Sequence, residues 1–308
     1  MAARVESVKR ARERTASALW RALRPHQWAK NLLVFVPLAL TPTLLADTAK
    51  WIALCWAFAA WSAVASAGYL ANDWVDLSAD RADAAKSGRP FASGVLPVPL
   101  GIAAALALAV FGVGAAALHV SSAFVAHLVA YGVLTLAYSL YLKRLLLLDV
   151  LLLAGFYTLR VLAGGAAASI ALTPWLLAFS LFLFLGLAFV KRYGELQRMT
   201  DSGAGRVSGR AYRREDLDLV MMLGTTSAYS SVLVLCLYIN SEHVGRQYPH
   251  PGALWFLVPL LLYWVSRIWF LAKRGELPGD PVAFAVRDRV SLAVGMLMAG
   301  VLWVAIDR

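Results

Sequence analysis

The sequence is poor in charged residues and in cysteine. Charged residues make up 15% of its 308 positions, whereas a soluble domain carries roughly a quarter. Because 60% of the residues are hydrophobic, this deficit indicates a polytopic helical membrane protein. The two cysteines, Cys55 and Cys236, both lie within apolar runs, so they offer neither a disulfide framework nor a metal-ligand spacing.

Several functional motifs are also missing from the sequence. It contains no Walker loop, no zinc-ligand spacing and no nucleophile–histidine–acid arrangement. The net charge of +11 is a feature of nucleic-acid-binding proteins, but the basic residues adjoin apolar runs and no nucleic-acid motif accompanies them, so we expect no nucleic-acid partner. Residues 1–30 lack an early apolar core with a cleavage site, so we expect no cleavable signal peptide.

Nine apolar runs are long enough to cross a membrane. They cover residues 31–47, 51–71, 97–118, 121–141, 145–168, 172–190, 219–239, 252–271 and 288–306. The sequence therefore predicts an all-α polytopic membrane protein with nine transmembrane helices. We expect one catalytic domain over 31–308, behind a basic cytoplasmic segment over 1–30.

Lysine and arginine are distributed unevenly between the two ends of these spans. The side that carries the N-terminus holds 24 of them and the other side holds three. Since these residues accumulate in the cytoplasm, we place the three long polar connections, 72–96, 191–218 and 272–287, on the cytoplasmic side. We expect a multi-pass protein of the bacterial plasma (inner) membrane, with a cytoplasmic N-terminus and active site.

The first long connection begins with NDWVDLSAD, residues 72–80. Asn72, Asp76 and Asp80 are four residues apart and share one helix face, with Asp73 beside them. Carboxylates at a membrane boundary are costly unless a cation compensates them. The natural cation is Mg²⁺, which is held by one or two carboxylates together with phosphate oxygens of a substrate. The alternative interpretation is an ordinary acidic loop.

The second long connection begins with VKRYGELQRMTD, residues 190–201. Lys191 and Arg192 suit phosphate groups, Arg192 as a bidentate fork and Lys191 as a point charge. Glu195 is placed to complete a metal shell. For the two basic residues, a positive-inside membrane anchor is an equal alternative.

Polar residues at other span ends are weaker candidates. Tyr138 and Lys143 lie at the cytoplasmic level between the fourth and fifth spans, where a tyrosine is often an aromatic-belt residue. Arg160 lies inside the fifth span, where it either lines the site or pairs with an aspartate. Lys30 precedes the first span, and Asp280 is either a site residue or the N-cap of a helix that begins with proline.

Taken together, these stretches resemble the UbiA-type intramembrane prenyltransferase superfamily. NDWVDLSAD is similar to its first motif, NDxxDxxxD, and spans with polar cytoplasmic connections after the second and sixth fit its fold. Within it, the chain most resembles the decaprenyl-phosphate phosphoribosyltransferase branch. The stretches that carry this likeness are RPHQWAKN (24–31), RPFASGVLPV (89–98), YSLYLKR (138–144), GFYTLRVLAGGAA (155–167), VKRYGEL (190–196) and DPVAFAVRDR (280–289).

One departure bears on the substrate. Ordinary members carry a second Asp-rich motif, DxxxD, after the sixth span, but here Lys191 and Arg192 stand beside a single acid, Glu195. The resemblance implies metal or diphosphate roles at the first motif, and ribose-phosphate or diphosphate contacts at Lys86, Arg89, Lys191, Tyr193 and Glu195. The full prediction assigns catalysis to Asp73, Asp76, Lys191 and Glu195, substrate binding to Lys30, Lys86, Arg89, Tyr138, Lys143, Arg160, Arg192 and Tyr193, and metal binding to Asn72, Asp76 and Asp80.

The resemblance implies Mg²⁺-dependent transfer of 5-phosphoribose from phosphoribosyl diphosphate to a polyprenyl (decaprenyl) phosphate. A first alternative is an intramembrane prenyltransferase that moves a prenyl group from a prenyl diphosphate to an aromatic or other small acceptor. A second is a transporter or lipid-binding membrane protein, which needs no Mg²⁺ cluster.

Overall fold

The computed structural model describes residues 15–84, 86–202, 211–277 and 279–306. For residues 199–202 it describes the backbone alone. Every regular element among these residues is a helix, so the predicted all-α class is confirmed. Residues 1–14 of the predicted N-terminal segment and 203–210 of the second polar connection lie outside the described residues.

Eight helical segments of the described residues are long and apolar enough to cross a membrane. They are α3 (Thr48–Val75), α5 (Val98–His119), α6 (Ser122–Leu140), α7 (Leu148–Ala168), α8 (Pro174–Ser202), α9 (Leu217–Ile239), η5 with α11 (Pro251–Phe256 and Leu257–Lys273) and α13 (Arg289–Ile306). The short elements between them are α4 (Leu77–Ala82), η3 (Leu142–Arg144), η4 (Arg214–Asp216), α10 (Glu242–Gln247) and α12 (Pro281–Ala285).

Nine spans were expected and eight are found among the described residues, because the first predicted span, 31–47, does not form one continuous helix. In its place the chain forms η1 (Pro25–Phe35), α2 (Val36–Ala39) and η2 (Pro42–Leu44). Pro37 and Pro42 lack the N–H that a continuous α-helix requires, and each begins or lies in the first turn of a short helix. The apolar run is therefore helical but broken.

The chain divides into two compact units. The first unit contains residues 1–31 and 53–141, and the second contains 32–52 and 142–308. Within the first unit, α5 packs closely on α3 at Gly112, where a Cβ atom would lie 2.8 Å from the Ala60 carbonyl oxygen. The prediction of one catalytic domain over 31–308 stays a prediction.

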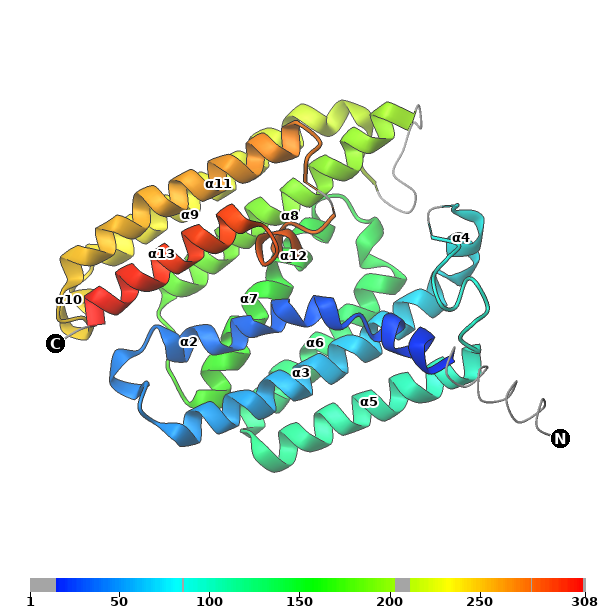
Figure 1. Cartoon of the computed structure of the whole chain (residues 1–308), viewed down its shortest axis with the longest axis horizontal. Helices are drawn as coiled ribbons and strands as arrows, with labels where there is room; N and C mark the ends of the chain where they lie inside the picture. Colours follow the sequence, from blue (N-terminus) through cyan, green and yellow to red (C-terminus); the bar gives the residue numbers. More distant parts are fainter. Residues whose placement is uncertain (1–14, 85, 203–210, 278, 307–308) are drawn as a thin grey trace. The chain divides into compact units, whose positions relative to one another are not determined.

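The second unit is built around α8. This helix packs against α7 and α9, and α11 lies beside α9 (Figure 1). The segment before α3 joins this unit because Gly164 of α7 meets the backbone of Val34, where a Cβ atom would lie 2.1 Å from the carbonyl oxygen. Any side chain at this position would force the helices apart, as is typical of small residues at packed membrane helices.

Large apolar side chains on the outer surface of the spans are exposed. Leu118, Val110, Met296, Phe256 and Trp303 are each more than half exposed. A soluble protein rarely exposes this much apolar surface, whereas helices that face lipid gain from it. The chain is therefore a multi-span membrane protein.

Candidate active site

The Asp-rich segment continues the helical path of α3 into α4. The amide of Asp76 donates to the Asn72 carbonyl at 2.9 Å, and the amide of Asp80 donates to the Asp76 carbonyl at 2.8 Å. These bonds keep Asn72, Asp76 and Asp80 in the i, i+4 register, although Asp76 itself lies between the two helices. The three side chains therefore follow one side of the helical path, as the spacing predicts.

Two of the acids in this segment are buried and bound by arginines. Arg24 Nη2 donates to Asp73 Oδ1 at 2.6 Å. Arg89 Nη1 lies 2.7 Å from Asp80 Oδ2 and 3.4 Å from Asp73 Oδ1. A buried carboxylate is costly unless it is paired and hydrogen-bonded. The arginines meet this requirement for Asp73 and Asp80.

The connection after α4 folds back to bring Arg89 to these acids. Phe91 and Leu96 are buried with Leu70 of α3 and with Ala18 and Ala22 of the helix over 15–23. Because these apolar contacts fix the chain just after Arg89, its guanidinium is held at the end of α3. This return is a tertiary feature that the local sequence does not indicate.

Arg24 occupies a strained backbone position. Its φ is +53°, at the junction between the helix over 15–23 and η1. A left-handed conformation at a residue other than glycine costs about 1–3 kcal/mol and persists where the surroundings fix it. Here the bond to Asp73 and the Tyr69 ring, 5.3 Å from the guanidinium carbon, hold the residue.

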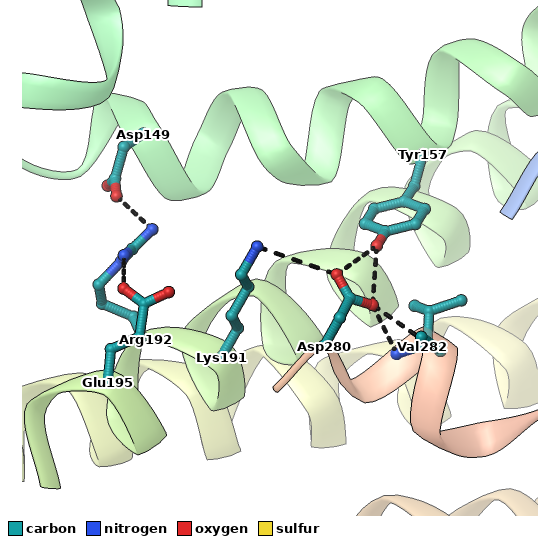
Figure 2. A network of polar contacts seen from close by, with 8 residues as sticks. Asp149, Tyr157, Lys191, Arg192, Glu195, Asp280 and Val282 are labelled. Atoms are coloured by element: carbon teal, nitrogen blue, oxygen red, sulfur yellow. Dashed lines mark hydrogen bonds and ion pairs between the residues drawn. The ribbon is translucent and has the colours of Figure 1, made fainter. Parts of the chain in front are cut away.

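The second unit carries its own polar network (Figure 2). Lys191 of α8 and Tyr157 of α7 both approach Asp280, with Lys191 Nζ at 3.9 Å and the Tyr157 hydroxyl 3.4 Å from each carboxylate oxygen. Asp280 also accepts from the amides of Val282 and Ala283 at 3.1 Å each. The N-cap interpretation of Asp280 is therefore confirmed, and the same carboxylate orients Lys191.

Arg192 points to a different partner, although it follows Lys191 on α8 (Figure 2). Its Nη2 lies 2.7 Å from Asp149 Oδ2, both side chains are fully buried, and Nη1 is bound to Glu195. In this arrangement the guanidinium binds two carboxylates, and its predicted substrate-binding role stays a prediction. Removing one member of a buried ion pair typically costs about 3–5 kcal/mol, so a structural role explains its charge.

Tyr212 completes the environment of Asp149. Its hydroxyl donates to Asp149 Oδ1 at 2.8 Å and accepts from the Leu147 amide at 3.3 Å. Burial raises the pKa of the Tyr212 phenol, and the nearby charge of Asp149 raises this pKa further. The hydroxyl therefore stays protonated and ties the segment before α9 to the start of α7.

The other predicted residues of the second unit differ in their surroundings. Arg160 is buried, donates to the Phe156 carbonyl at 2.6 Å and lies 5.8 Å from the Tyr157 ring. Tyr193 is buried in the apolar core against Trp269, with ring centroids 6.0 Å apart. The predicted contact of Tyr193 with the substrate stays a prediction. Lys143 lies in η3 and is half-buried.

The remaining predicted residues belong to the first unit. Lys86 is paired with Asp83 at 2.9 Å on the surface. Lys30 in η1 and Tyr138 near the end of α6 are both half-buried. The structure thus gathers Asp73, Asp80 and Arg89 in one unit and Lys191, Arg192 and Glu195 in the other.

Comparison with known proteins decides the family. The sequence matches the UbiA prenyltransferase family over residues 32–304. The chain belongs to this family. Solved UbiA structures share its fold: a UbiA homolog from Archaeoglobus fulgidus bound to GPP and Mg²⁺ superposes with a TM-score of 0.66 at 15% identity, covering 94% of this chain and all of that one.

Three relatives show the range of proteins that this UbiA chain resembles. It is 38% identical to the uncharacterized protein y4nM of Sinorhizobium fredii over 90% of its length, but spans only 54% of that protein. It is 34% identical to the nodulation protein NoeC of Azorhizobium caulinodans, covering 88% of this chain and 87% of the relative. It is 33% identical to the decaprenyl-phosphate phosphoribosyltransferase of Mycolicibacterium smegmatis, covering 94% and 92% respectively.

At the first motif, few protein side chains are available as metal ligands. Among the described residues, no group of three or more His, Cys, Asp or Glu side chains is arranged to hold a metal. Asp80 is bound to Arg89, and its predicted metal role stays a prediction. Asn72 and Asp76 are half-buried at the break between α3 and α4, and a carboxylate with an amide oxygen fits Mg²⁺ when substrate phosphates complete the shell.

Sequence reasoning missed the partners that organise this UbiA site. Arg24 is the first residue of the RPHQWAKN stretch, and nothing in the sequence links it to Asp73. Tyr157 carries no signal beyond its position three residues before Arg160 on α7. Asp149 and Arg192 are visible as charges near span ends, but their pairing depends on how α7 packs against α8.

Proposed function

We propose that the chain transfers 5-phosphoribose from phosphoribosyl diphosphate to a polyprenyl phosphate and releases diphosphate. The observation that carries this proposal is the polar end of α8. Glu195 is bound to Arg192, while Lys191 is 30% exposed and held by Asp280 at 3.9 Å. Among the described side chains, this end offers a cation to a phosphate, and its acids Glu195 and Asp280 each bind a cationic side chain.

The relatives also support phosphoribosyl transfer. The likeness to the phosphoribosyltransferase of Mycolicibacterium smegmatis extends over 94% of this chain. The relatives y4nM and NoeC carry names that specify no reaction. We place the protein in a bacterial inner membrane, with the polar ends of α3 and α8 in the cytoplasm, where phosphoribosyl diphosphate is available.

In the proposed mechanism, Asn72 and Asp76 would hold Mg²⁺, and the ion would supply positive charge to the leaving diphosphate. The bond between C1 of the ribose and the diphosphate oxygen breaks, and its electron pair leaves with the diphosphate. An oxygen of the lipid phosphate forms the new bond to C1 from the opposite face. Because this acceptor is already an anion, the site needs no strong general base.

The protein's part in this reaction is positioning and charge stabilisation. Lys191 receives either the 5-phosphate of the donor or the phosphate of the lipid. Asp280 orients Lys191 before the substrate binds, so that little side-chain freedom is lost on binding. Arg89 lies on the connection that follows the metal residues and faces the diphosphate.

A prenyltransferase is the second candidate. The observation in its favour is the fold shared with a UbiA homolog whose structure was solved with GPP and Mg²⁺. At 15% identity this likeness is informative about the fold and not about the donor. The two candidates differ in the group transferred and share a diphosphate leaving group.

Diphosphate release separates the candidates. Purified protein is supplied with Mg²⁺ and with each donor and acceptor alone or in pairs, and the diphosphate released is measured with a coupled assay. We expect release only when phosphoribosyl diphosphate and a polyprenyl phosphate are both present. Release from a prenyl diphosphate with an aromatic acceptor, and none from phosphoribosyl diphosphate, would favour the prenyltransferase.

A further inference from the structure

Arg24 and Arg89 converge on a single buried oxygen. Asp73 Oδ1 lies 2.6 Å from Arg24 Nη2 and 3.4 Å from Arg89 Nη1, and Arg89 Nη1 also binds Asp80 at 2.7 Å. The two carboxylates are 2% and 5% exposed, whereas the arginine side chains are 25% and 31% exposed. The acids therefore lie beneath and the guanidinium groups lie nearer the surface.

Each of the two guanidinium groups has N–H donors that the two aspartates do not use. Toward the described residues, Arg24 donates only from Nη2 and Arg89 only from Nη1. A guanidinium carries five N–H donors in a fixed planar fork, so most donors of each arginine are not used by the acids. Planar forks of this kind match phosphate oxygens, which they bind in pairs.

The location of this arginine pair favours a diphosphate as its ligand. Asp73 belongs to the same helical turn as Asn72 and Asp76, the two residues that fit a Mg²⁺ site. A metal-bound diphosphate at those residues carries further phosphate oxygens that need donors. The strained backbone of Arg24, with φ at +53°, is consistent with a residue that is held in place for a ligand.

We infer that Asp73 is a positioning residue that holds Arg24 and Arg89 as a two-arginine clamp on the donor's diphosphate. This assigns Asp73 to the arginines in place of the catalytic role predicted from the sequence, and it adds Arg24 to the substrate contacts. The inference rests on the proposed function in one respect, that the donor is a diphosphate. Both candidate donors meet that condition.

The Asp73→Asn variant distinguishes two roles of Asp73 by the direction in which the affinity for diphosphate changes. If Asp73 serves only to neutralise charge, removing it makes the cluster more positive and diphosphate binds as well as before or more tightly. If Asp73 positions the clamp, the two guanidinium groups lose their shared partner and separate, so diphosphate binds more weakly. The matched control is Asp83→Asn, which removes the same charge from a surface carboxylate paired with Lys86 in the following connection.

The experiment is calorimetric titration of inorganic diphosphate with Mg²⁺ into purified full-length protein. We expect Asp73→Asn to weaken binding about tenfold or more, the scale of a charge-assisted contact, and Asp83→Asn not to weaken it. In steady-state kinetics, Asp73→Asn should raise the KM for the donor and leave the KM for the lipid acceptor unchanged. A merely structural role would not separate the two constants.

Lysine variants keep the test decisive if Asp73→Asn fails to fold. Arg24→Lys and Arg89→Lys retain the charge but lose the planar fork, and each should weaken diphosphate binding severalfold. Unchanged binding in Asp73→Asn or in both lysine variants would overturn the inference, as would wild-type protein that binds no diphosphate. Because inorganic diphosphate contains no transferred group, these results are independent of whether phosphoribose or a prenyl group is transferred.

Discussion

At the scale of single residues, the polar side chains near the span ends differ in what holds them. Asp149 and Arg192 are fully buried and bind each other, so their charges stabilise the packing of α7 on α8. Lys191, one position away, is partly exposed and loosely held by Asp280. Spacing along α8 shows that these charges are close, but only the packing of neighbouring helices separates the structural arginine from the available lysine.

Asp76→Ala should abolish turnover while the protein remains folded. The side chain is half-buried at the break between two helices and contributes little to apolar packing. Losing a main stabiliser of leaving-group charge lowers kcat by about 10²-fold or more. Asp83→Ala is the control, because it removes a carboxylate from the surface of the same connection. Near-normal activity of Asp76→Ala, with or without Mg²⁺, would contradict the metal role.

Lys191→Ala should weaken the use of one phosphate substrate. A lost charge-assisted contact is worth about 1.5–3 kcal/mol, which appears as a higher KM for either phosphoribosyl diphosphate or the polyprenyl phosphate. The substrate whose KM rises identifies the phosphate that Lys191 contacts. Lys273→Ala at the exposed end of α11 removes the same charge and serves as the control. Equal constants for Lys191→Ala and wild type would refute this contact.

At the scale of helices, the apolar runs predict eight of the spans closely. The run 97–118 corresponds to α5 (Val98–His119) and the run 288–306 to α13 (Arg289–Ile306). The run 31–47 misleads because hydropathy does not register the effect of Pro37 and Pro42 on helix continuity. The first-motif register and the N-cap at Asp280 were also predictable, since both depend on local spacing. The bond of Arg24 to Asp73 and the approach of Tyr157 and Lys191 to Asp280 were beyond prediction, because they join distant segments.

The start of α13 provides a prediction on pH. Arg267 of α11 binds both carboxylate oxygens of Asp288, at 2.6 and 3.1 Å, and Asp288 caps the helix through the Ser291 amide at 2.8 Å. The hydrogen bond from Arg267 lowers the pKa of Asp288 below its usual range, and the bonds from Ser291 lower it further. The folded state thus favours the ionised acid, and this stabilisation is present at neutral pH and lost as the pH falls through the lowered pKa.

Asp288→Asn should therefore melt below wild type at neutral pH, with a gap that narrows under acidic conditions. The measurement is thermal unfolding in detergent at pH 7 and at a series of values below about 4, the usual pKa of an aspartate. A gap that is constant across this range would show that the charge of Asp288 contributes nothing to stability.

At the scale of the whole molecule, the charge asymmetry of the sequence predicts the topology of this UbiA-family chain. The match to the UbiA family covers residues 32–304, and the sequence places 24 lysines and arginines on one side of its spans and three on the other. This asymmetry predicts that the connections after the second and sixth sequence-predicted spans are cytoplasmic, where soluble phosphorylated substrates are found.

Cysteine labelling tests this topology. In a background that carries Cys55→Ala and Cys236→Ala, Glu276→Cys should react with a membrane-impermeant maleimide only from the cytoplasmic side, and Glu242→Cys only from outside. Both glutamates are exposed and lie in different connections between spans. Labelling of the two positions in the reverse pattern would invert the topology and separate the polar clusters from their substrates.

The central claim is the identity of the transferred group, and mass spectrometry of the lipid product tests it most directly. Purified protein is incubated with Mg²⁺, polyprenyl phosphate, an aromatic acceptor, phosphoribosyl diphosphate and a prenyl diphosphate in one reaction, with Asp76→Ala protein as the blank. We predict that the polyprenyl phosphate gains one phosphoribosyl group and that the aromatic acceptor is unchanged. A prenylated acceptor with unmodified polyprenyl phosphate would contradict the account.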